Sequence, residues 1–212
     1  MNKKKVLELL NLHHEAFFDA KPYADETEHP TPSDTRAWSQ ILVSLLTGVK
    51  GLKRNKGADL ADGSDVKGAN TWDAIDTPRF NGVIKAGTKS KTAGKMEYLD
   101  TVKFLFFVLW DNEPINGRER CRIWVVRPTK DKLFRGICEK WYTQLDGKII
   151  KSWNFQLHPP RGKNSNEFRN LCGNLNYPLL FLAEWVGNKY LIKVYDPQIL
   201  KKDFYTSPII KK

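Results

Sequence analysis

The stretch Thr101-Val-Lys-Phe-Leu-Phe-Phe-Val-Leu-Trp110 decides the predicted fold. From Phe104 onward, apolar residues fill both alternating sets of positions, whereas a strand with one solvated face alternates apolar and polar side chains. The apolar run is also far too short to cross a bilayer as a helix. We therefore expect a central β-strand that is covered on both sides.

The sequence before this strand predicts two helices. Apolar residues recur at helical spacing over residues 3–19 and again over residues 34–47, and a loop over residues 21–32 separates the two. The second helix is expected to begin at Ser33 or Asp34 and to end at Gly48. Its expected buried stripe consists of Trp38, Ile41, Leu42, Leu45 and Leu46.

The rest of the chain predicts mainly strands, in a single domain over residues 1–212 that starts with a helix and loop over residues 1–32. The expected fold class is α/β, with a central mixed β-sheet flanked by helices. The further expected elements are a strand over 80–85, a strand over 120–127, a helix opened by Thr129, a strand near 149–157, a short helix over 165–171 and a hairpin formed by 179–186 and 190–195.

The composition favours a polyanionic partner. The formal net charge is +11 and the isoelectric point is about 9.5, which indicates nucleic acid first and an anionic membrane second. A hydrophobic content of 41% excludes a disordered tail protein. The three cysteines are far apart and form no metal-ligand pattern, and no export signal is evident, so a soluble, cytoplasmic protein is expected.

The segment Gly57-Ala-Asp-Leu-Ala-Asp-Gly-Ser-Asp-Val-Lys-Gly68 gathers three carboxylates and a lysine around an expected hairpin turn at Asp62-Gly63. Residues two apart on a strand share a face, so Asp65 and Lys67 are expected to point the same way. A three-residue loop would bring Asp59 onto that face, and a two-residue loop would put Asp59 on the opposite face. The loop length therefore decides whether the three side chains meet.

Two carboxylates and a lysine on one face can hydrolyse a phosphodiester bond. Asp59 and Asp65 would bind Mg²⁺ through oxygen ligands, and the ion would activate water and neutralise charge on the phosphate. Lys67 would orient the attacking water or stabilise the pentavalent phosphate. The alternative is an ordinary solvated Asp-Gly turn, and Asp62 fits that alternative better than Asp59 or Asp65 does.

The pattern Asp59…Asp65-Val66-Lys67 resembles the signature of the PD-(D/E)XK nucleases, the superfamily of most type II restriction endonucleases. The helix before it and the apolar strand after it agree with that resemblance. Two departures are that Ala58 stands in place of the family's proline, and that the gap between the acids is shorter than usual. The second departure leaves open whether Asp59 or Asp62 is the first metal ligand, and we favour Asp59.

The resemblance implies a Mg²⁺-dependent, site-specific double-strand DNA endonuclease in the cytoplasm of a prokaryote, as part of a restriction–modification system. A palindromic target would imply a homodimer. In many members an acid from the preceding helix completes the site; here that helix offers Gln40 and Asp34, and the role stays unassigned. The alternatives are a repair or resolvase-type nuclease of the same superfamily and a basic nucleic-acid-binding protein without catalysis.

Residues suited to DNA contacts are concentrated in a possible recognition insertion over residues 145–175. Arginine pairs with guanine, and asparagine and glutamine pair with adenine, in the major groove. Lysines of the 85–95 stretch suit phosphate contacts instead. The alternating Arg118, Arg120 and Arg122 either line the DNA cleft or face solvent. The expected DNA-contact residues are Lys89, Lys91, Gln156, His158, Arg161, Lys163, Asn164, Asn166 and Arg169.

Overall fold

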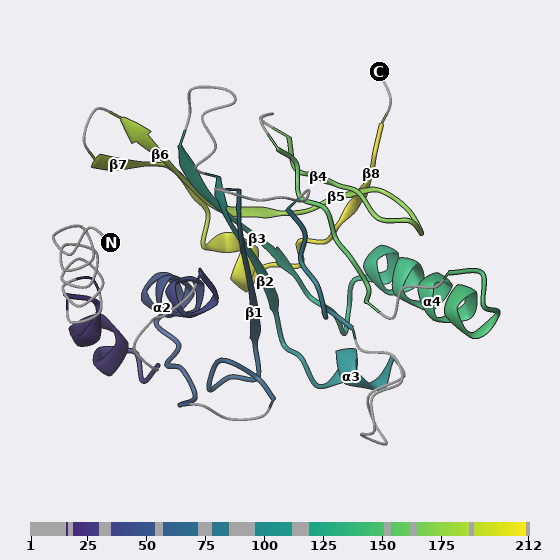
Figure 1. The fold of residues 1–212 in the computed structure, drawn as a ribbon, viewed down its shortest axis with the longest axis horizontal. Coiled ribbons are helices and arrows are strands. Elements are labelled where there is room, and N and C mark those ends of the chain that lie inside the picture. The colour runs from purple at the N-terminus through teal and green to yellow at the C-terminus, as the bar shows by residue number, and fades with distance from the viewer. Residues whose placement is uncertain are drawn as a thin grey trace, which may run out of the picture.

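A computed structural model of the chain describes residues 16, 19–29, 35–53, 57–71, 78–84, 96–111, 119–150, 154–161, 165–186 and 189–210. Within these residues a five-stranded mixed sheet has the strand order β1-β2-β3-β6-β7 (Figure 1). Its strands are β1 (Asp65–Asn70), β2 (Leu105–Asp111), β3 (Arg120–Val126), β6 (Leu179–Val186) and β7 (Lys189–Tyr195). β1 pairs with β2 in parallel, and each remaining neighbouring pair is antiparallel.

Residues 105–110 of the apolar stretch lie in β2, and the two faces of this strand contribute to two hydrophobic cores. Leu105, Phe107 and Leu109 belong to one cluster of buried residues, and Phe106 and Val108 belong to the other. This alternation follows from the two-residue period of a strand. The prediction of a central strand covered on both sides is therefore confirmed, although β2 begins at Leu105 and residues 101–104 precede it.

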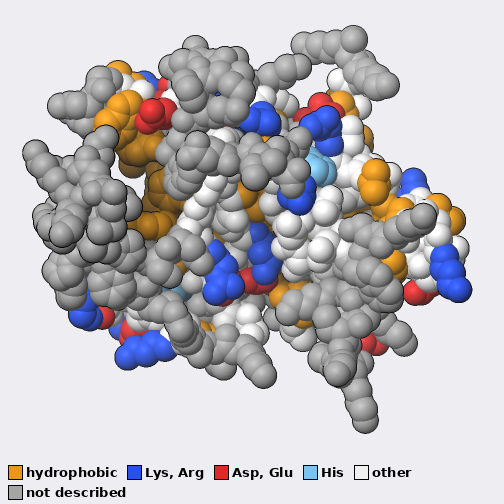
Figure 2. All heavy atoms as spheres, in the orientation of Figure 1, with side chains coloured by type: hydrophobic (Ala, Val, Ile, Leu, Met, Phe, Trp, Pro, Cys, Tyr) orange, Lys and Arg blue, Asp and Glu red, His pale blue; other side chains and the backbone are white. Residues whose placement is uncertain are grey.

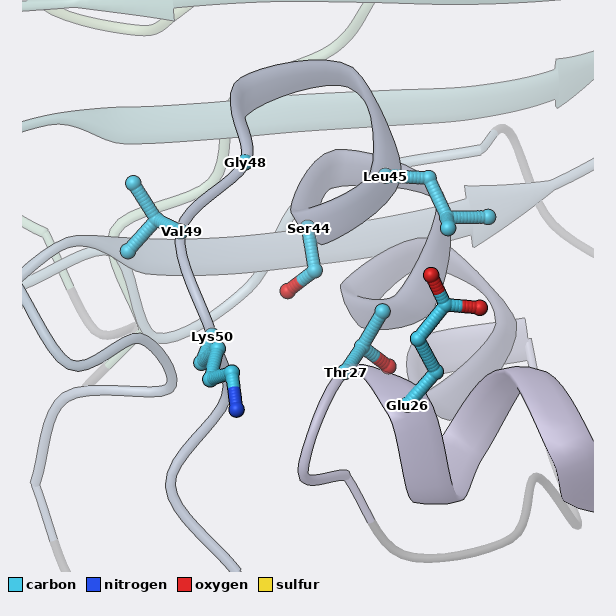
Figure 3. A pocket seen from close by; sticks show the side chains of 7 residues that line it. All are labelled: Glu26, Thr27, Ser44, Leu45, Gly48, Val49 and Lys50. Carbon is cyan, nitrogen blue, oxygen red and sulfur yellow. The ribbon is translucent and has the colours of Figure 1, made fainter.

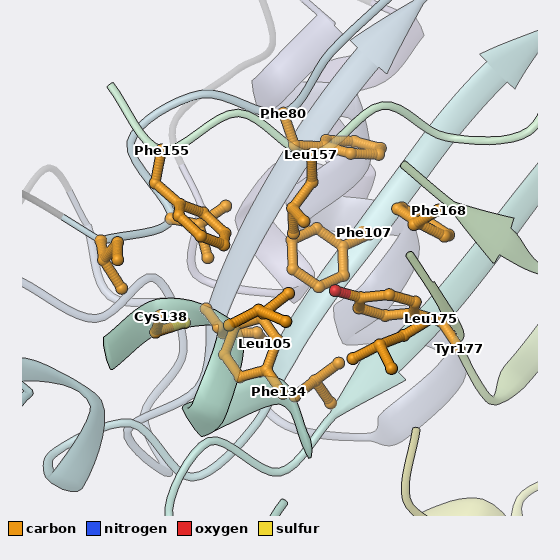
Figure 4. Packing of buried hydrophobic residues seen from close by; sticks show 14 of the residues in the cluster. Phe80, Leu105, Phe107, Phe134, Cys138, Phe155, Leu157, Phe168, Leu175 and Tyr177 are labelled. Carbon is orange, nitrogen blue, oxygen red and sulfur yellow. The ribbon is translucent and has the colours of Figure 1, made fainter. Parts of the chain in front are cut away.

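A helix covers each face of the sheet. α2 (Thr35–Thr47) packs against β1, and α4 (Lys132–Asp146) covers the opposite face (Figure 1). Aromatic side chains fill the space beneath α4, where the Tyr177 ring contacts both Phe134 from the helix and Phe107 from β2 (Figure 4). The expected α/β class, a mixed sheet flanked by helices, is confirmed.

The extent of α2 agrees with the prediction, and its buried face agrees in part, because Ile41 is buried and Leu42 and Leu46 are partly buried against the core. Gly48 ends the helix with a φ of +72°, a conformation that favours glycine. Trp38 and Leu45, both expected inside, are 42% and 48% exposed. The buried face also includes small and polar side chains, and Ser39 lies where Gly68 allows β1 to approach closely. The buried residues are Ala37, Ser39, Gln40, Ile41, Val43 and Ser44.

Close packing of α2 on β1 depends on Gly68. A Cβ atom added there would lie 2.5 Å from Ser39 Oγ, 3.0 Å from the Thr35 carbonyl oxygen and 3.2 Å from Arg36 Cα. Real Cβ atoms essentially never approach to 2.5 Å, so the helix could not lie where it does over any other residue. Gly68 thus sets the distance at which the polar face of α2 meets β1.

Three further expectations were wrong. Residues 21–26, expected in a loop, are helical and continue a helix that includes residues 19 and 20, with Ala20 and Ala24 buried one turn apart. The expected helix over 165–171 is replaced by β4 (Glu167–Phe168) and a turn, because Phe168 packs into the aromatic core. Phe80 forms an isolated bridge with Leu157 where a strand over 80–85 was expected. The expected helix over 3–19 lies largely outside the described residues.

Short elements complete the described structure. β4 pairs with β5 (Leu175–Asn176), which pairs with β8 (Ser207–Pro208). α3 (Glu97–Asp100) precedes β2, and α5 (Gln198–Lys201) follows β7. Asp131, and not Thr129, caps α4, accepting a hydrogen bond from the backbone N–H of Phe134. No described helix combines the length and the apolar character needed to cross a membrane.

Candidate active site

Residues 59–64 form a closed turn and do not form a strand of the expected hairpin. The backbone N–H groups of Asp59 and Leu60 both donate to the carbonyl oxygen of Ser64, at 3.1 Å each. Leu60 makes an antiparallel bridge with Gly51. The hairpin prediction was wrong because β1, which begins at Asp65, takes its partner from β2, far along the chain.

The turn nevertheless carries Asp59 back to the free edge of β1. The N–H of Asp65 donates to Phe104 on the β2 side, so the next N–H along the strand, that of Val66, points away from the sheet. Asp59 Oδ2 accepts that N–H at 2.9 Å. The Asp59 carboxylate therefore satisfies an edge group of the strand that bears Asp65 and Lys67.

Asp65 lies at the centre of the resulting cluster. Its Oδ2 atom is 2.6 Å from Lys67 Nζ and accepts a hydrogen bond from the Tyr98 hydroxyl at 3.1 Å. The Asp65 side chain is almost fully buried, whereas the Lys67 side chain is 22% exposed. The expected shared face of these two residues is confirmed, and Lys67 keeps access to solvent.

Gln40 completes the cluster from α2. Its Nε2 donates to Asp59 Oδ1 at 2.6 Å, and its side chain is buried. Because Asp59 Oδ2 is held by Val66 and Oδ1 by Gln40, both oxygens of this carboxylate are oriented. The turn, β1, α2 and α3 thus supply Asp59, Asp65, Lys67, Gln40 and Tyr98 to one place.

The pKa values of the two carboxyl groups are shifted in opposite directions. Burial raises the pKa of Asp59 to about 7, and a hydrogen bond with Asp65 and repulsion between the two groups add to the increase. Burial would also raise the pKa of Asp65, but hydrogen bonds to Asp59 and Lys67 and the charge of Lys67 hold it below its usual value. The pair therefore takes up a proton as the pH falls through about 7, and Asp59 is the more readily protonated of the two groups.

Asp62 has a different part in the structure. Its Oδ1 accepts the N–H of Ser64 at 3.1 Å, which is the pattern of an Asx turn, and its Oδ2 is 3.0 Å from Lys103 Nζ. These contacts fit the expectation of a turn residue.

The oxygen atoms of this cluster fit a hard divalent cation. Two adjacent carboxylates that share a proton are an unfavourable pair, and a cation in place of the proton would relieve their repulsion. Mg²⁺ commonly binds one or two carboxylates and keeps several waters. Within the described residues no group of three or more His, Cys, Asp or Glu side chains could hold a metal, and the acidic pair that this part of the chain offers in the cluster is Asp59 and Asp65.

The expected DNA-contact residues fall into two groups. Lys89, Lys91, Lys163 and Asn164 lie outside the described residues. The others lie on two antiparallel arms, residues 154–161 and 165–170, in which His158 and Arg169 exchange both backbone hydrogen bonds at 2.9 Å. We call these two arms the ribbon. Arg161 and Gln156 are partly exposed on it and Arg169 is exposed, whereas Asn166 is turned inward to accept a hydrogen bond from Trp124.

Arg120 and Arg122 neither line a cleft nor face solvent. Both are 2% exposed and both hydrogen-bond to Asp111 Oδ2, each at 3.1 Å. Arg118 lies outside the described residues. The alternating arginines suggested a charged surface, but a carboxylate at the end of the neighbouring strand draws two of them into the core.

A hollow apart from this cluster lies between the 19–26 helix, α2 and the segment after Gly48 (Figure 3). Its lining includes a carboxylate, Glu26, and a lysine, Lys50, whose Nζ is 2.6 Å from Glu28. Nearby, the buried His29 shares a 2.7 Å hydrogen bond with Ser44. Lys50 pairs with Glu28 and His29 pairs with Ser44, and Glu26 is the one carboxylate among the lining residues. The chemistry of the 59–67 cluster, with two adjacent carboxylates, is therefore not repeated here.

Sequence reasoning did not assign a role to Gln40 or Tyr98. Gln40 was noticed on α2, but the expected apolar stripe did not include this polar residue, which is buried. Tyr98 follows the lysine-rich 85–95 stretch and is 33 residues from Asp65, so no local pattern links the two.

Comparisons with known proteins agree with the expected class. The family model described as MamI restriction endonuclease matches residues 22–189, which include the whole cluster. The type II restriction enzyme MamI of Microbacterium ammoniaphilum is 34% identical over 160 residues, which cover 68% of this chain and 49% of the relative. The chain thus matches about half the length of this relative. No solved structure matches the chain.

Proposed function

Since the chain belongs to the MamI restriction endonuclease family, we propose that it is a type II restriction enzyme that cuts both strands of DNA at a specific sequence. The observation that carries the proposal is the convergence of Asp59, Asp65 and Lys67, with the two carboxyl groups in hydrogen-bond contact. A turn without function would expose its acids to water and would not bury two of them together.

Mg²⁺ is the proposed cofactor, with Asp59 and Asp65 as its protein ligands. When bound, the ion would activate water and polarise the scissile phosphate. Gln40 would hold Asp59 and Tyr98 would hold Asp65, so that neither carboxylate has to reorient on binding. The proton on Asp59 would leave as the cation enters, because a ligating carboxylate must be deprotonated.

Lys67 is the proposed catalytic cation. Its ammonium group is anchored by Asp65 and remains accessible, so it can donate a hydrogen bond to the attacking water or to a non-bridging phosphate oxygen. A fixed ammonium at this position would stabilise the additional negative charge of the pentavalent phosphate. Because the charge develops only during the reaction, Lys67 should affect the rate more than DNA affinity.

Double-stranded DNA is the proposed partner, contacted in its grooves by residues of the 145–175 segment and at its phosphates by Lys89 and Lys91. A homodimer would place two such sites on the two strands of a palindromic target. We propose that residues 1–212 act as one nuclease domain, and that the enzyme works in the bacterial cytoplasm, where its DNA substrate is found.

The test compares the wild-type chain with Asp65→Ala, Lys67→Ala and Lys103→Ala on phage DNA, with Mg²⁺ or with EDTA. Lys103 is the matched control, since it is a nearby lysine that pairs with Asp62 outside the cluster. Discrete fragments with Mg²⁺ and none with EDTA are expected for the wild type and for Lys103→Ala. The other two variants should lose at least about 10²-fold in kcat and still retard DNA on a gel.

Other outcomes would contradict specific parts of the proposal. A smear of fragments would indicate a nuclease without sequence specificity, and intact but retarded DNA would indicate a binding protein without catalysis. Cleavage that survives both Asp65→Ala and Lys67→Ala would overturn the site assignment.

A further inference from the structure

The ribbon is attached to the central sheet by two neighbouring residues of β3. Arg122 and Trp124 are two apart and share one face of the strand. Arg122 Nη2 donates to the carbonyl oxygen of Pro160, on the first arm. Trp124 Nε1 donates to Asn166 Oδ1, on the second arm, at 2.9 Å. One face of one strand therefore holds both arms.

Aromatic contacts reinforce this attachment. The Arg122 guanidinium lies 4.8 Å from the centroid of the Trp124 ring, so these two side chains also stack on each other. The Trp124 ring packs edge-on against Phe168 of the second arm, with centroids 5.0 Å apart. A change in Arg122 or Trp124 should therefore affect both arms.

Burying Arg122 is costly, and the structure compensates for that cost. Asp111 at the end of β2 accepts from both Arg120 and Arg122, and Thr71 donates to its other oxygen at 3.2 Å. Two guanidinium groups and one carboxylate are thus enclosed at the base of the ribbon. A buried ionic group of this kind rarely improves stability over apolar packing, and its best-attested benefit is to specify one geometry.

We propose that Arg122 and Trp124 are positioning residues for sequence discrimination. They fix the two arms so that His158, Arg161 and Arg169 meet the edges of the base pairs in one register. This inference rests on the proposed function, and neither residue belongs to the cluster around Asp65. Altering them should therefore change which sequences are cut more than how fast a cut is made.

The test uses Arg122→Lys and Trp124→Phe in the full chain, with Arg127→Lys as the matched control. Arg127 has the same kinds of contact in a different place: it lies 4.8 Å from the Phe104 ring and donates to the carbonyl oxygens of Ile199 and Lys202. Cut sites are mapped by sequencing fragment ends. Then kcat and KM are measured on a duplex with the mapped site and on duplexes with one base pair changed.

For Arg122→Lys we expect the ratio of kcat/KM between the correct and altered duplexes to fall at least tenfold, mainly through KM. The kcat on the correct duplex should stay within about threefold of the wild type. Trp124→Phe should shift the ratio in the same direction, and Arg127→Lys should leave it unchanged. An unchanged ratio in both test variants, or an equal loss in the control, would overturn the proposal.

Amide hydrogen exchange of the DNA-free proteins separates this inference from the proposed function. The amides of His158 and Arg169, which bond to each other across the ribbon, should exchange at least tenfold faster in the two test variants. The amide of Phe106 in β2 should remain protected, which also reports that the variant has folded. If the ribbon amides of a folded variant exchange at the wild-type rate, the positioning role is contradicted. If the wild type does not cut DNA at all, only the proposed function is contradicted.

Discussion

At the scale of single residues, the feature with the most consequences is the proton held by Asp59. Its pKa of about 7 arises first from burial and then from the contact with Asp65. A group whose pKa is raised on folding stabilises the folded state fully below its unfolded pKa, which is about 3.9 for Asp, and loses that contribution as the pH rises through the folded value. The metal-free protein should therefore lose stability as the pH rises from about 4 to about 7.

Replacing Asp59 with an amide tests this electrostatic strain. Asp59→Asn cannot ionise, and its side-chain oxygen can still accept the N–H of Val66. At pH 8 without metal we expect this variant to be more stable than the wild type by about 1 kcal/mol, or about 2–4 °C in Tm. The gain should shrink as the pH falls from 7 toward 4 and vanish below about pH 4, as measured by thermal unfolding across this range in EDTA. If Asp59→Asn loses as much stability between pH 5 and pH 8 as the wild type does, the result would argue against a shared proton.

Magnesium should favour the wild type over Asp59→Asn in thermal stability. Added Mg²⁺ should raise the Tm of the wild type at pH 8 by replacing the proton between the carboxylates, and it should raise the Tm of Asp59→Asn much less. An equal increase in both proteins would place the cation elsewhere.

At the scale of elements, the contact between α2 and β1 governs the geometry of the site. Gly68 permits the close approach, and Gln40 uses it to reach Asp59. A shift of α2 away from the sheet would therefore reach the carboxylates as well as the core.

We expect Gly68→Ala to destabilise the fold by about 2 kcal/mol, since the new methyl group would overlap Ser39 and the backbone of α2. The kcat should fall as well, because the bond from Gln40 to Asp59 would lengthen. Gly136→Ala in α4 is the matched control: a Cβ there meets nothing within 4 Å, so a helical alanine should be neutral or slightly stabilising. Urea unfolding of the three proteins measures the difference, and equal stability of Gly68→Ala and the wild type would contradict the close packing.

Asp131 joins two elements that are far apart in the chain. It caps α4 and also accepts from both the N–H and the hydroxyl of Thr206, each at 2.7 Å, while fully buried. Asp131→Ala should cost about 3 kcal/mol, because the cap is lost and two donors of Thr206 remain without an acceptor. The exposed Asp146→Ala at the other end of α4 should change stability by less than about 0.5 kcal/mol. Chemical denaturation of both variants gives the comparison, which fails if their effects are alike.

What could be predicted at this scale depended on how local the signal was. The two apolar faces of β2, the limits of α2 and the strands β6 and β7 each follow from a pattern within one short segment. The parallel pairing of β1 with β2 joins residues 40 apart in sequence, and no local pattern contains it. The spacing of Asp65 and Lys67 was sufficient to place them together, whereas Gln40 and Tyr98 arrive through packing that no spacing encodes.

At the scale of the whole molecule, charge is the dominant property. The net charge is +11, and Figure 2 shows Lys and Arg side chains at several places on the visible face. The same view shows hydrophobic side chains collected toward the side where β6 and β7 lie. The exposed hydrophobic residues of these two strands include Trp185, Tyr190 and Ile192. A basic surface of this kind attracts DNA before any base is read.

DNA affinity should accordingly depend strongly on salt. If about six phosphates are neutralised, the association constant should fall about 10³-fold between 50 and 200 mM salt. Fluorescence anisotropy with a labelled duplex, in EDTA to prevent cleavage, measures this slope. A change of less than about tenfold would mean that the positive charge of the chain does not face the DNA.

The hydrogen bond from Val66 to Asp59 also has a practical consequence for handling the protein. β1 is the outermost strand of the described sheet, and an outermost strand with free N–H groups is a template for aggregation. Asp59 accepts a hydrogen bond from one of these groups. Asp59→Ala would therefore remove a proposed metal ligand and would also expose an aggregation-prone strand edge. An inactive protein for crystallisation with DNA is therefore better made as Lys67→Ala, which leaves the edge covered.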